Sequence, residues 1–214
     1  MRGVVPILSD PGFDTERLQA RPLDEQDEAL FCDLYTDAGT MRHIAAPMSA
    51  GRAAGRFRSV LTSMRASAPE RVFLALHARS RGDSLGLCGI ARFDAPRERA
   101  EIGIILKPCA RGQGLAREAL SGLVSSTFAR HAIREVWVAY APANTPFERL
   151  AIGLGFSPCE DHAAFEAHTG KHARSIDRCD WNSRQTANQR GTDHVEGIEH
   201  SGSAGARRRA AWSG

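Results

Sequence analysis

The sequence has no apolar run long enough to cross a membrane. None of its apolar stretches approaches the roughly 20 residues that a membrane-spanning helix needs. The apolar run near the start, residues 4–8, is also too short for a secretory signal peptide. We therefore expect a cytoplasmic location and no membrane partner.

Cysteine is scarce and forms no recognisable pattern. The five cysteines are odd in number and include no Cys-x-x-Cys pair, which fits small core residues in a reducing compartment. Cys109 precedes a glycine-containing loop, but no histidine is close in sequence to activate it as a nucleophile. His162, His168 and His172 are spaced by six and four residues, which suits no standard metal site. We expect a polar loop there and no metal.

The chain also lacks a strong excess of charge of one sign. It has 28 Lys and Arg against 25 Asp and Glu, a net charge of +3. Five arginines and three acids in residues 182–214 account for +2 of this. A nearly neutral remainder argues against nucleic acid as the main ligand. The same tail has almost no aliphatic residues, so we predict that it is disordered.

Two common phosphate-binding patterns are missing. No Gly-x-x-x-x-Gly-Lys-Ser/Thr run occurs, and Arg117 stands where a dinucleotide fingerprint would need a third glycine. The sequence does contain Arg111-Gly-Gln-Gly-Leu-Ala116, between a β-type run at 101–106 and an amphipathic helix pattern from Leu115. A strand, a glycine loop and a helix N-terminus together present free backbone N–H groups to a phosphate. This indicates a phosphorylated cofactor, although the pattern alone also fits an ordinary strand–turn–helix junction.

The remaining periodicities predict one α/β domain with four helices around a curved, mostly antiparallel sheet of six to seven strands. Apolar spacing predicts helices over residues 24–37, 49–64, 115–130 and 146–154. β-type runs predict strands over 18–22, 72–77, 85–93, 101–106, 135–140 and 174–179, with one more in 157–173. The strands at 72–77, 85–93 and 101–106 should form an antiparallel meander. We place the domain at residues 12–181 and the disordered tail at 182–214.

Four segments in order resemble the GNAT superfamily of acyl-CoA-dependent N-acetyltransferases. The Arg111 loop is similar to its motif A, Arg/Gln-x-x-Gly-x-Gly/Ala. The segment from Asn144 to Leu-Gly-Phe156 is similar to its motif B, in which an Asn opens a helix that closes on Leu-Gly-Phe. The segments at 15–23 and 178–181 resemble the first and last strands of the RimJ/RimL-like branch, which acetylates ribosomal proteins.

The resemblance implies acetyl-CoA as co-substrate, with no metal, and assigns cofactor-binding residues. The backbone at the end of the 101–106 strand would hold the pantetheine arm, and an N–H near its last residue would polarise the thioester carbonyl where the central strands separate. The loop N–H groups would bind the pyrophosphate, and an asparagine amide would orient cofactor or strand. The cofactor-binding residues are then Ile104, Ile105, Leu106, Arg111, Gly112, Gln113, Gly114, Leu115, Ala116 and Asn144.

The catalytic residues are harder to assign. Glu101 is the best candidate for a general base, although it also fits an ordinary charged residue at a strand start; His43 and His131 are weaker candidates. The family often has a Tyr seven residues after the motif-B Asn, and this branch often has a Ser three residues after it. Here these positions hold Ala151 and Phe147, so no obvious general acid remains.

The expected function is transfer of an acetyl group to a primary amine, either a protein N-terminal α-amine or a small molecule. The missing Tyr and Ser leave open an alternative, a CoA-binding module with little or no catalysis. The expected partners are therefore an amine-bearing small molecule or a protein N-terminus, with no nucleic acid, in a monomer or homodimer.

Overall fold

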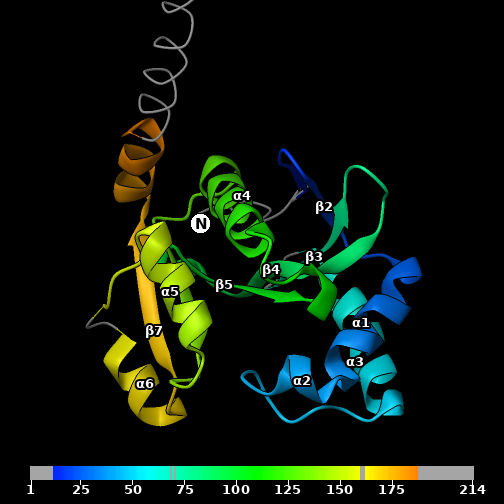
Figure 1. Cartoon of the computed structure of the whole chain (residues 1–214). Coiled ribbons are helices and arrows are strands. Elements are labelled where there is room, and N and C mark those ends of the chain that lie inside the picture. The colour runs from blue at the N-terminus through cyan, green and yellow to red at the C-terminus, as the bar shows by residue number, and fades with distance from the viewer. Residues whose placement is uncertain (1–11, 68, 70, 160–161, 188–214) are drawn as a thin grey trace, which may run out of the picture. The chain divides into compact units, whose positions relative to one another are not determined.

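The structure is a computed structural model that describes residues 12–67, 69, 71–159 and 162–187. The chain divides into two compact units at Arg178 and Cys179. The first unit contains one seven-stranded sheet whose strands follow chain order from β1 to β7 (Figure 1). The strands are β1 Phe13–Asp14, β2 Leu18–Pro22, β3 Val72–Ala78, β4 Ser84–Asp94, β5 Arg99–Leu106, β6 Glu135–Tyr140 and β7 His172–Asp177.

Six α-helices and three short 3-10 helices connect these strands. The α-helices are α1 Glu28–Thr36, α2 Ala38–Met41, α3 Ala50–Met64, α4 Leu115–Arg130, α5 Thr145–Leu154 and α6 Ala163–Thr169. The 3-10 helices are η1 Glu25–Asp27, η2 Ala95–Arg97 and η3 Pro108–Ala110. None of the described helices has the length and hydropathy needed to span a bilayer.

The sheet positions the helices through its two faces. On one face, Ala75 and Leu87 pack with a cluster from α1 and α3 that includes Phe31 and Phe57. On the other face α4 buries the side chains of Leu115, Ala119, Leu123 and Phe128. The predicted α/β class and mostly antiparallel sheet are confirmed, and the predicted meander is formed by β3, β4 and β5.

The predicted element boundaries differ from the structure in three regions. Asp24 caps η1 with a capping box, and the α-helix starts only at Glu28. The prediction of four helices omitted the short helices α2 and α6. The strand expected within 157–173 is reduced to one bridge, Ser157 to Ser175, because residues 163–169 are helical.

The C-terminal region also differs from its prediction. Strand β7 ends at Asp177 rather than at residue 179, and residues 178–187 are helical. The first residues of the expected tail, 182–187, therefore belong to a helix. The remainder, 188–214, lies outside the described residues, so the disordered tail stays a prediction.

The pairing of β5 with β6 creates the site. These are the only parallel neighbours in the described sheet, and their register covers just Arg99, Ala100 and Glu101 of β5. Residues 102–106 continue to pair with β4, but they have no partner on β6. The two central strands therefore separate after Glu101, which opens the sheet between β5 and β6.

Candidate active site

A cavity of about 240 Å³ lies where β5 and β6 separate. Its floor comes from β4 and β5, and its walls come from α1, the segment after α2, β6, α5 and the residue before β7. The lining is mainly apolar and aromatic. The residues are Tyr35, His43, Ile44, Phe73, Leu87, Cys88, Gly89, Ala91, Glu101, Ile102, Gly103, Ile104, Ile105, Ala139, Tyr140, Asn144, Phe147 and Lys171.

A second hollow of about 190 Å³ continues the cavity toward the glycine loop. The two hollows share His43, Ile44, Ile104, Ile105 and Asn144. The second hollow also reaches the last residue of β5 and the first residue of the loop, Leu106 and Arg111. The structure thus brings the predicted strand-end residues, the motif-B asparagine and the start of the loop to one continuous groove.

The loop between η3 and α4 has the conformation that its glycines predict. Gly112 and Gly114 have φ values of 75° and 77°, in the left-handed region that favours glycine. Gly114 is the N-cap of α4, and the helix begins at Leu115. Among the described hydrogen bonds, none uses the N–H groups of residues 112–116 as donors. These N–H groups, with the positive end of the α4 dipole, suit an anionic group.

Arg111 has a different role from its neighbours in the loop. Its guanidinium donates from Nε and Nη2 to the Leu106 carbonyl at 3.2 and 2.9 Å, and from Nη2 to Thr40 Oγ1 at 2.7 Å. The side chain therefore joins the loop to the end of β5 and to α2. It positions the groove rather than offering a free cation to it.

A second set of bonds fixes the far side of the loop. The Glu118 carboxylate in the first turn of α4 accepts from Thr15 Oγ1 at 2.5 Å, from the Arg17 N–H at 2.8 Å and from Arg17 Nε at 2.6 Å. Arg17 Nη1 also donates to the carbonyl of Gln113 at 3.0 Å. Sequence reasoning missed this network, although the Thr15-Glu-Arg17 segment had already been noted for its family resemblance.

Glu101 lies on the cavity floor at the point where the strands separate. Its side chain is 20% exposed, and burial raises the pKa of its carboxyl. The positive charges of Arg92, 3.9 Å away, and of Lys171, together with His162, oppose this rise without cancelling it. A carboxyl with this environment is suited to accept a proton at a pH closer to neutral than an ordinary glutamate.

The two histidine candidates have different positions. His43 lines both hollows, and its Nε2 accepts from Arg42 Nε at 3.0 Å. His131 follows α4 on the other face of the sheet, beside Val72 and Leu123. Burial lowers the pKa of His131. The structure therefore brings His43 to the site but leaves His131 away from it.

The start of α5 confirms the absence of a hydroxyl at the expected places. Asn144 is the N-cap, and its Oδ1 accepts from the Phe147 N–H at 3.4 Å. The Phe147 ring lines the cavity, whereas Ala151 is buried. Tyr140, which sequence reasoning missed, lines the cavity too, but its hydroxyl accepts from Arg174 and donates to Glu148.

This arrangement places the chain in a defined class. The separated central strands, the loop at the N-terminus of α4 and the groove between them form one continuous site with an end that suits an anionic group. Residues 17–157 match the model of the acetyltransferase (GNAT) domain family, and the chain belongs to that family. A search of curated proteins found no significant match.

Solved structures show the same fold. The spermidine N-acetyltransferase from Vibrio cholerae, in complex with CoA and spermine, is 15% identical with a TM-score of 0.66, covering 78% of this chain and 99% of that one. An acetyltransferase from Agrobacterium tumefaciens is 20% identical with a TM-score of 0.63, covering 83% and 99%. The Salmonella typhimurium enzyme that modifies the N-terminal serine of ribosomal protein L7/L12 is 14% identical with a TM-score of 0.63, covering 76% and 96%. At these identities the likeness shows the fold alone.

Proposed function

We propose that this protein transfers the acetyl group of acetyl-CoA to a primary amine by direct attack of the amine on the thioester. The observation that carries the proposal is the separation of β5 from β6 after Glu101, together with the free N–H groups of residues 112–116 at the end of the same groove. The end of the groove at the glycine loop suits a phosphate, and the end at Glu101 suits a reacting group. Membership of the GNAT family supports the same reading.

The residues of the groove fit this co-substrate. The N–H groups of the loop bind the pyrophosphate, and the α4 dipole adds roughly 0.3–1 kcal/mol at an exposed terminus. The exposed backbone of Ile104 and Ile105 holds the pantetheine arm in the manner of an added strand. The strands separate after Glu101, five residues before Leu106, so a backbone N–H of β5 near this separation, rather than one near Leu106 as the sequence predicted, donates to the thioester carbonyl and polarises it. Acetyl-CoA supplies the activated acyl group when bound.

Glu101 acts as the base in this proposal. An amine with a pKa of about 10 is only about one part in a thousand neutral at pH 7, which costs roughly 4 kcal/mol. An α-amino group with a pKa near 8 costs only about 1.4 kcal/mol. A carboxyl whose pKa is raised by burial takes up the amine proton, directly or through water. Its contribution is therefore largest for amines of high pKa.

The departing thiolate needs little help from a general acid. The CoA thiol, if it resembles cysteine, has a pKa of about 8.5, so the thiolate is a reasonable leaving group. The Phe147 ring and Ala151 offer no proton at the two positions where the family often has a hydroxyl. We infer slower chemistry than in members with that acid, rather than a different reaction.

The cavity lining favours an acceptor with one amine over a polyamine. Glu101 is the only acid among the described residues that line it, and Lys171 adds a positive charge to the same lining. A polyamine would bring several ammonium groups to a single carboxylate, which is electrostatically unfavourable. A protein N-terminus or a small monoamine fits better. The finer assignment to the RimJ/RimL-like branch rests on this lining and on the segment resemblances.

The test measures cofactor binding and turnover separately. Calorimetric titration with acetyl-CoA should show one site, and thiol release should follow addition of a peptide with a free N-terminus. Glu101→Gln should lower the acetylation rate of high-pKa amines more than that of α-amines. As a control, Glu16→Gln at an exposed glutamate should leave both rates unchanged. Absence of binding at high micromolar acetyl-CoA refutes the proposal. Binding without thiol release over a broad amine panel favours the alternative of a CoA-binding module without catalysis.

A further inference from the structure

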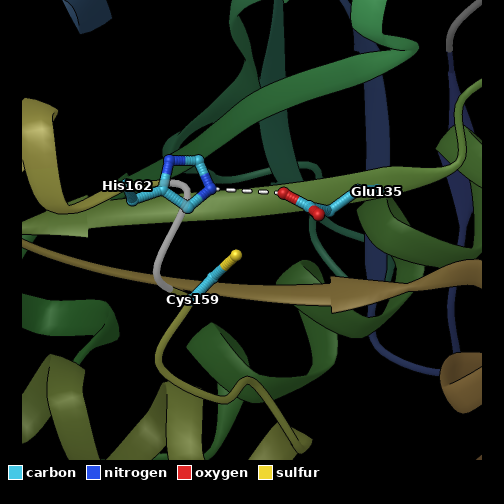
Figure 2. A group of neighbouring side chains, drawn as sticks. All are labelled: Glu135, Cys159 and His162. Carbon is cyan, nitrogen blue, oxygen red and sulfur yellow. Dashed lines mark hydrogen bonds and ion pairs between the residues drawn. The ribbon is translucent and has the colours of Figure 1, made fainter.

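A cysteine, a histidine and a glutamate converge beside the first residue of β6, outside the proposed acyl-transfer groove (Figure 2). One potential ligand atom from each of Glu135, Cys159 and His162 lies within 4.8 Å of both others. Glu135 begins β6, and His162 precedes α6. Figure 2 shows the His162 Nε2 directed at the Glu135 carboxylate, with the Cys159 sulfur on the same side of the imidazole. We propose that these three residues bind one zinc ion.

The backbone brings two of the ligands together. The N–H of His162 donates to the carbonyl of Cys159 at 3.1 Å, which holds these two residues close together. Cys-x-x-His is a short chelating pair, comparable in spacing to the Cys-x₂-Cys half of a zinc finger. The backbone hydrogen bond and the proximity of the two ligand atoms mean that both residues are near each other before any ion arrives, so less chain entropy is lost on binding.

The third ligand is at a suitable distance. His162 Nε2 and Glu135 Oε1 are 3.2 Å apart. Zinc–nitrogen and zinc–oxygen bonds of about 2.0–2.2 Å at a tetrahedral angle separate two ligand atoms by about 3.4 Å. The present pair is thus already spaced for a shared ion. The side chain of His162 is 7% exposed and that of Glu135 is 16% exposed, so the site is largely protected from water.

Neighbouring side chains orient the ligands. The Trp137 ring stacks on the His162 imidazole with centroids 4.5 Å apart and an interplanar angle of 28°. Arg99 Nε lies 3.5 Å from the same Glu135 oxygen. Metal-binding carboxylates are commonly held by such outer partners. The Arg99 charge weakens attraction for a cation, but the cysteine thiolate and the glutamate carboxylate together neutralise a divalent ion.

The ligand set favours zinc over the hard cations. Thiolate and imidazole are ligands for borderline or soft metals, whereas calcium and magnesium prefer oxygen alone. On binding, the Cys159 thiol releases its proton to solvent, and His162 carries its remaining proton on Nδ1. Metal–sulfur, metal–nitrogen and metal–oxygen bonds would form as the six-coordinate hydrated ion loses five of its waters, and the one retained water would complete a four-coordinate site. The ion would tie Cys159 and His162 to β6.

The histidine spacing alone predicts no metal site in this region. The spacing of His162, His168 and His172 suited no standard metal site, and in the structure His168 and His172 are exposed. Only His162 joins the cluster. Its partner three residues earlier is a cysteine, and the third ligand lies 27 residues before it, on a different strand.

The experiment uses the full chain, free of any affinity tag, after removal of metal with a chelator. Zinc is titrated in competition with a chromophoric chelator, and cobalt(II) is added separately as a spectroscopic probe. We expect one equivalent of zinc, a cobalt spectrum of tetrahedral type with a sulfur-to-metal charge-transfer band, and a higher melting temperature with zinc. Cys159→Ser should remove that band and weaken zinc binding by more than about 100-fold, since even outer-partner changes cost 10–100-fold.

Control variants separate ligation from loss of fold. Cys179→Ser and His168→Asn change exposed residues of the same types and should leave zinc affinity unchanged. The cobalt spectrum of the unaltered chain tests sulfur ligation without any variant. Zinc affinity no tighter than high micromolar, or a cobalt spectrum without a sulfur band, would overturn the proposal and leave Glu135 and His162 as a hydrogen-bonded pair. Equal affinity in Cys159→Ser would do the same.

Discussion

A valine in place of Gly103 would test the cavity without disturbing the packing around it. Gly103 lies on β5 and lines the cavity, and a Cβ placed on it meets no atom within 4 Å. Its φ is not in the left-handed region. Glycine inside a strand is destabilising by roughly 0.5–1 kcal/mol relative to alanine, and valine has a high preference for strands. Gly103→Val should therefore raise the free energy of unfolding by about 1 kcal/mol, or the melting temperature by ~2–4 °C.

The same valine should impair the reaction. Its two methyl groups occupy the space between Glu101 and the end of β5, where the proposed acetyl group and amine meet. We expect kcat/KM to fall at least tenfold, which corresponds to a loss of about 1.4 kcal/mol of transition-state stabilisation. The assays are thiol release at saturating acetyl-CoA with varied amine, and thermal melting. Stability and activity should change in opposite directions.

A matched glycine on a helix provides the control. A Cβ at Gly55 in α3 also meets no atom within 4 Å. Gly55→Ala should gain about 1 kcal/mol of stability from helix preference and leave the kinetics unchanged. If Gly103→Val melts higher but keeps the original kcat/KM, the cavity is not the reaction site. If it melts lower, the space seen around Gly103 does not exist in solution.

Three further predictions concern the surroundings of the groove. Burial alone would raise the pKa of Glu118, but its bonds to the N-terminal segment outweigh burial and lower it. Glu118→Gln should therefore lower the free energy of unfolding by about 1–2 kcal/mol at pH 7. This difference from the unaltered chain should disappear as the pH falls from about 4.3, the ordinary pKa of a glutamate, through the lowered pKa of the folded state. Urea unfolding at pH 7 and at a pH below the lowered pKa measures both effects. Arg92→Gln removes a positive charge beside Glu101, so the acidic limb of kcat/KM should shift to higher pH, while Arg97→Gln should shift nothing. Asn144→Ser keeps a helix cap, so stability should be retained while acetyl-CoA affinity falls; unchanged affinity would limit Asn144 to capping.

The conformation of the proposed phosphate-binding loop could be predicted from sequence because local backbone chemistry determines it. Gly112 and Gly114 adopt positive φ, and the helix starts at the residue where the apolar period begins. A residue in the left-handed conformation followed by a helix N-terminus is determined by only a few consecutive residues of the sequence. This loop conformation can be predicted from the sequence where only glycine adopts the required backbone angles easily.

The separation of β5 and β6 could not be predicted in the same way. Both strands read as ordinary β-type runs, and their pairing joins residues 99–101 to residues 135–137 across the length of α4. The role of Arg111 is hidden for the same reason, since Thr40 lies 71 residues away. Contacts of this range depend on how helices and sheet pack, and single-residue preferences carry no information about them.

The short helices were missed for a related physical reason. Helix α2 has four residues and α6 has seven, too few for an apolar period to become visible. Helix α6 also has His162 as its N-cap residue with no side-chain cap hydrogen bond, so its start carries no sequence signal. Isolated helices of this length are unstable in water, and only packing against the rest of the domain forms them.

The proposed acceptor-binding part of the cavity was hard to predict because its residues come from segments far apart in the sequence. The cavity wall takes Tyr35 from α1, Phe147 from α5 and Lys171 from the turn before β7, so no single segment contains the recognition surface. The charge of the cavity lining can nevertheless be deduced once the fold is known. One buried carboxylate beside one ammonium group selects against an acceptor with several positive charges. An amine panel should therefore rank α-amino peptides above spermidine for this chain. A reversed ranking would show that additional acids outside the cavity, rather than Glu101 alone, bind the acceptor.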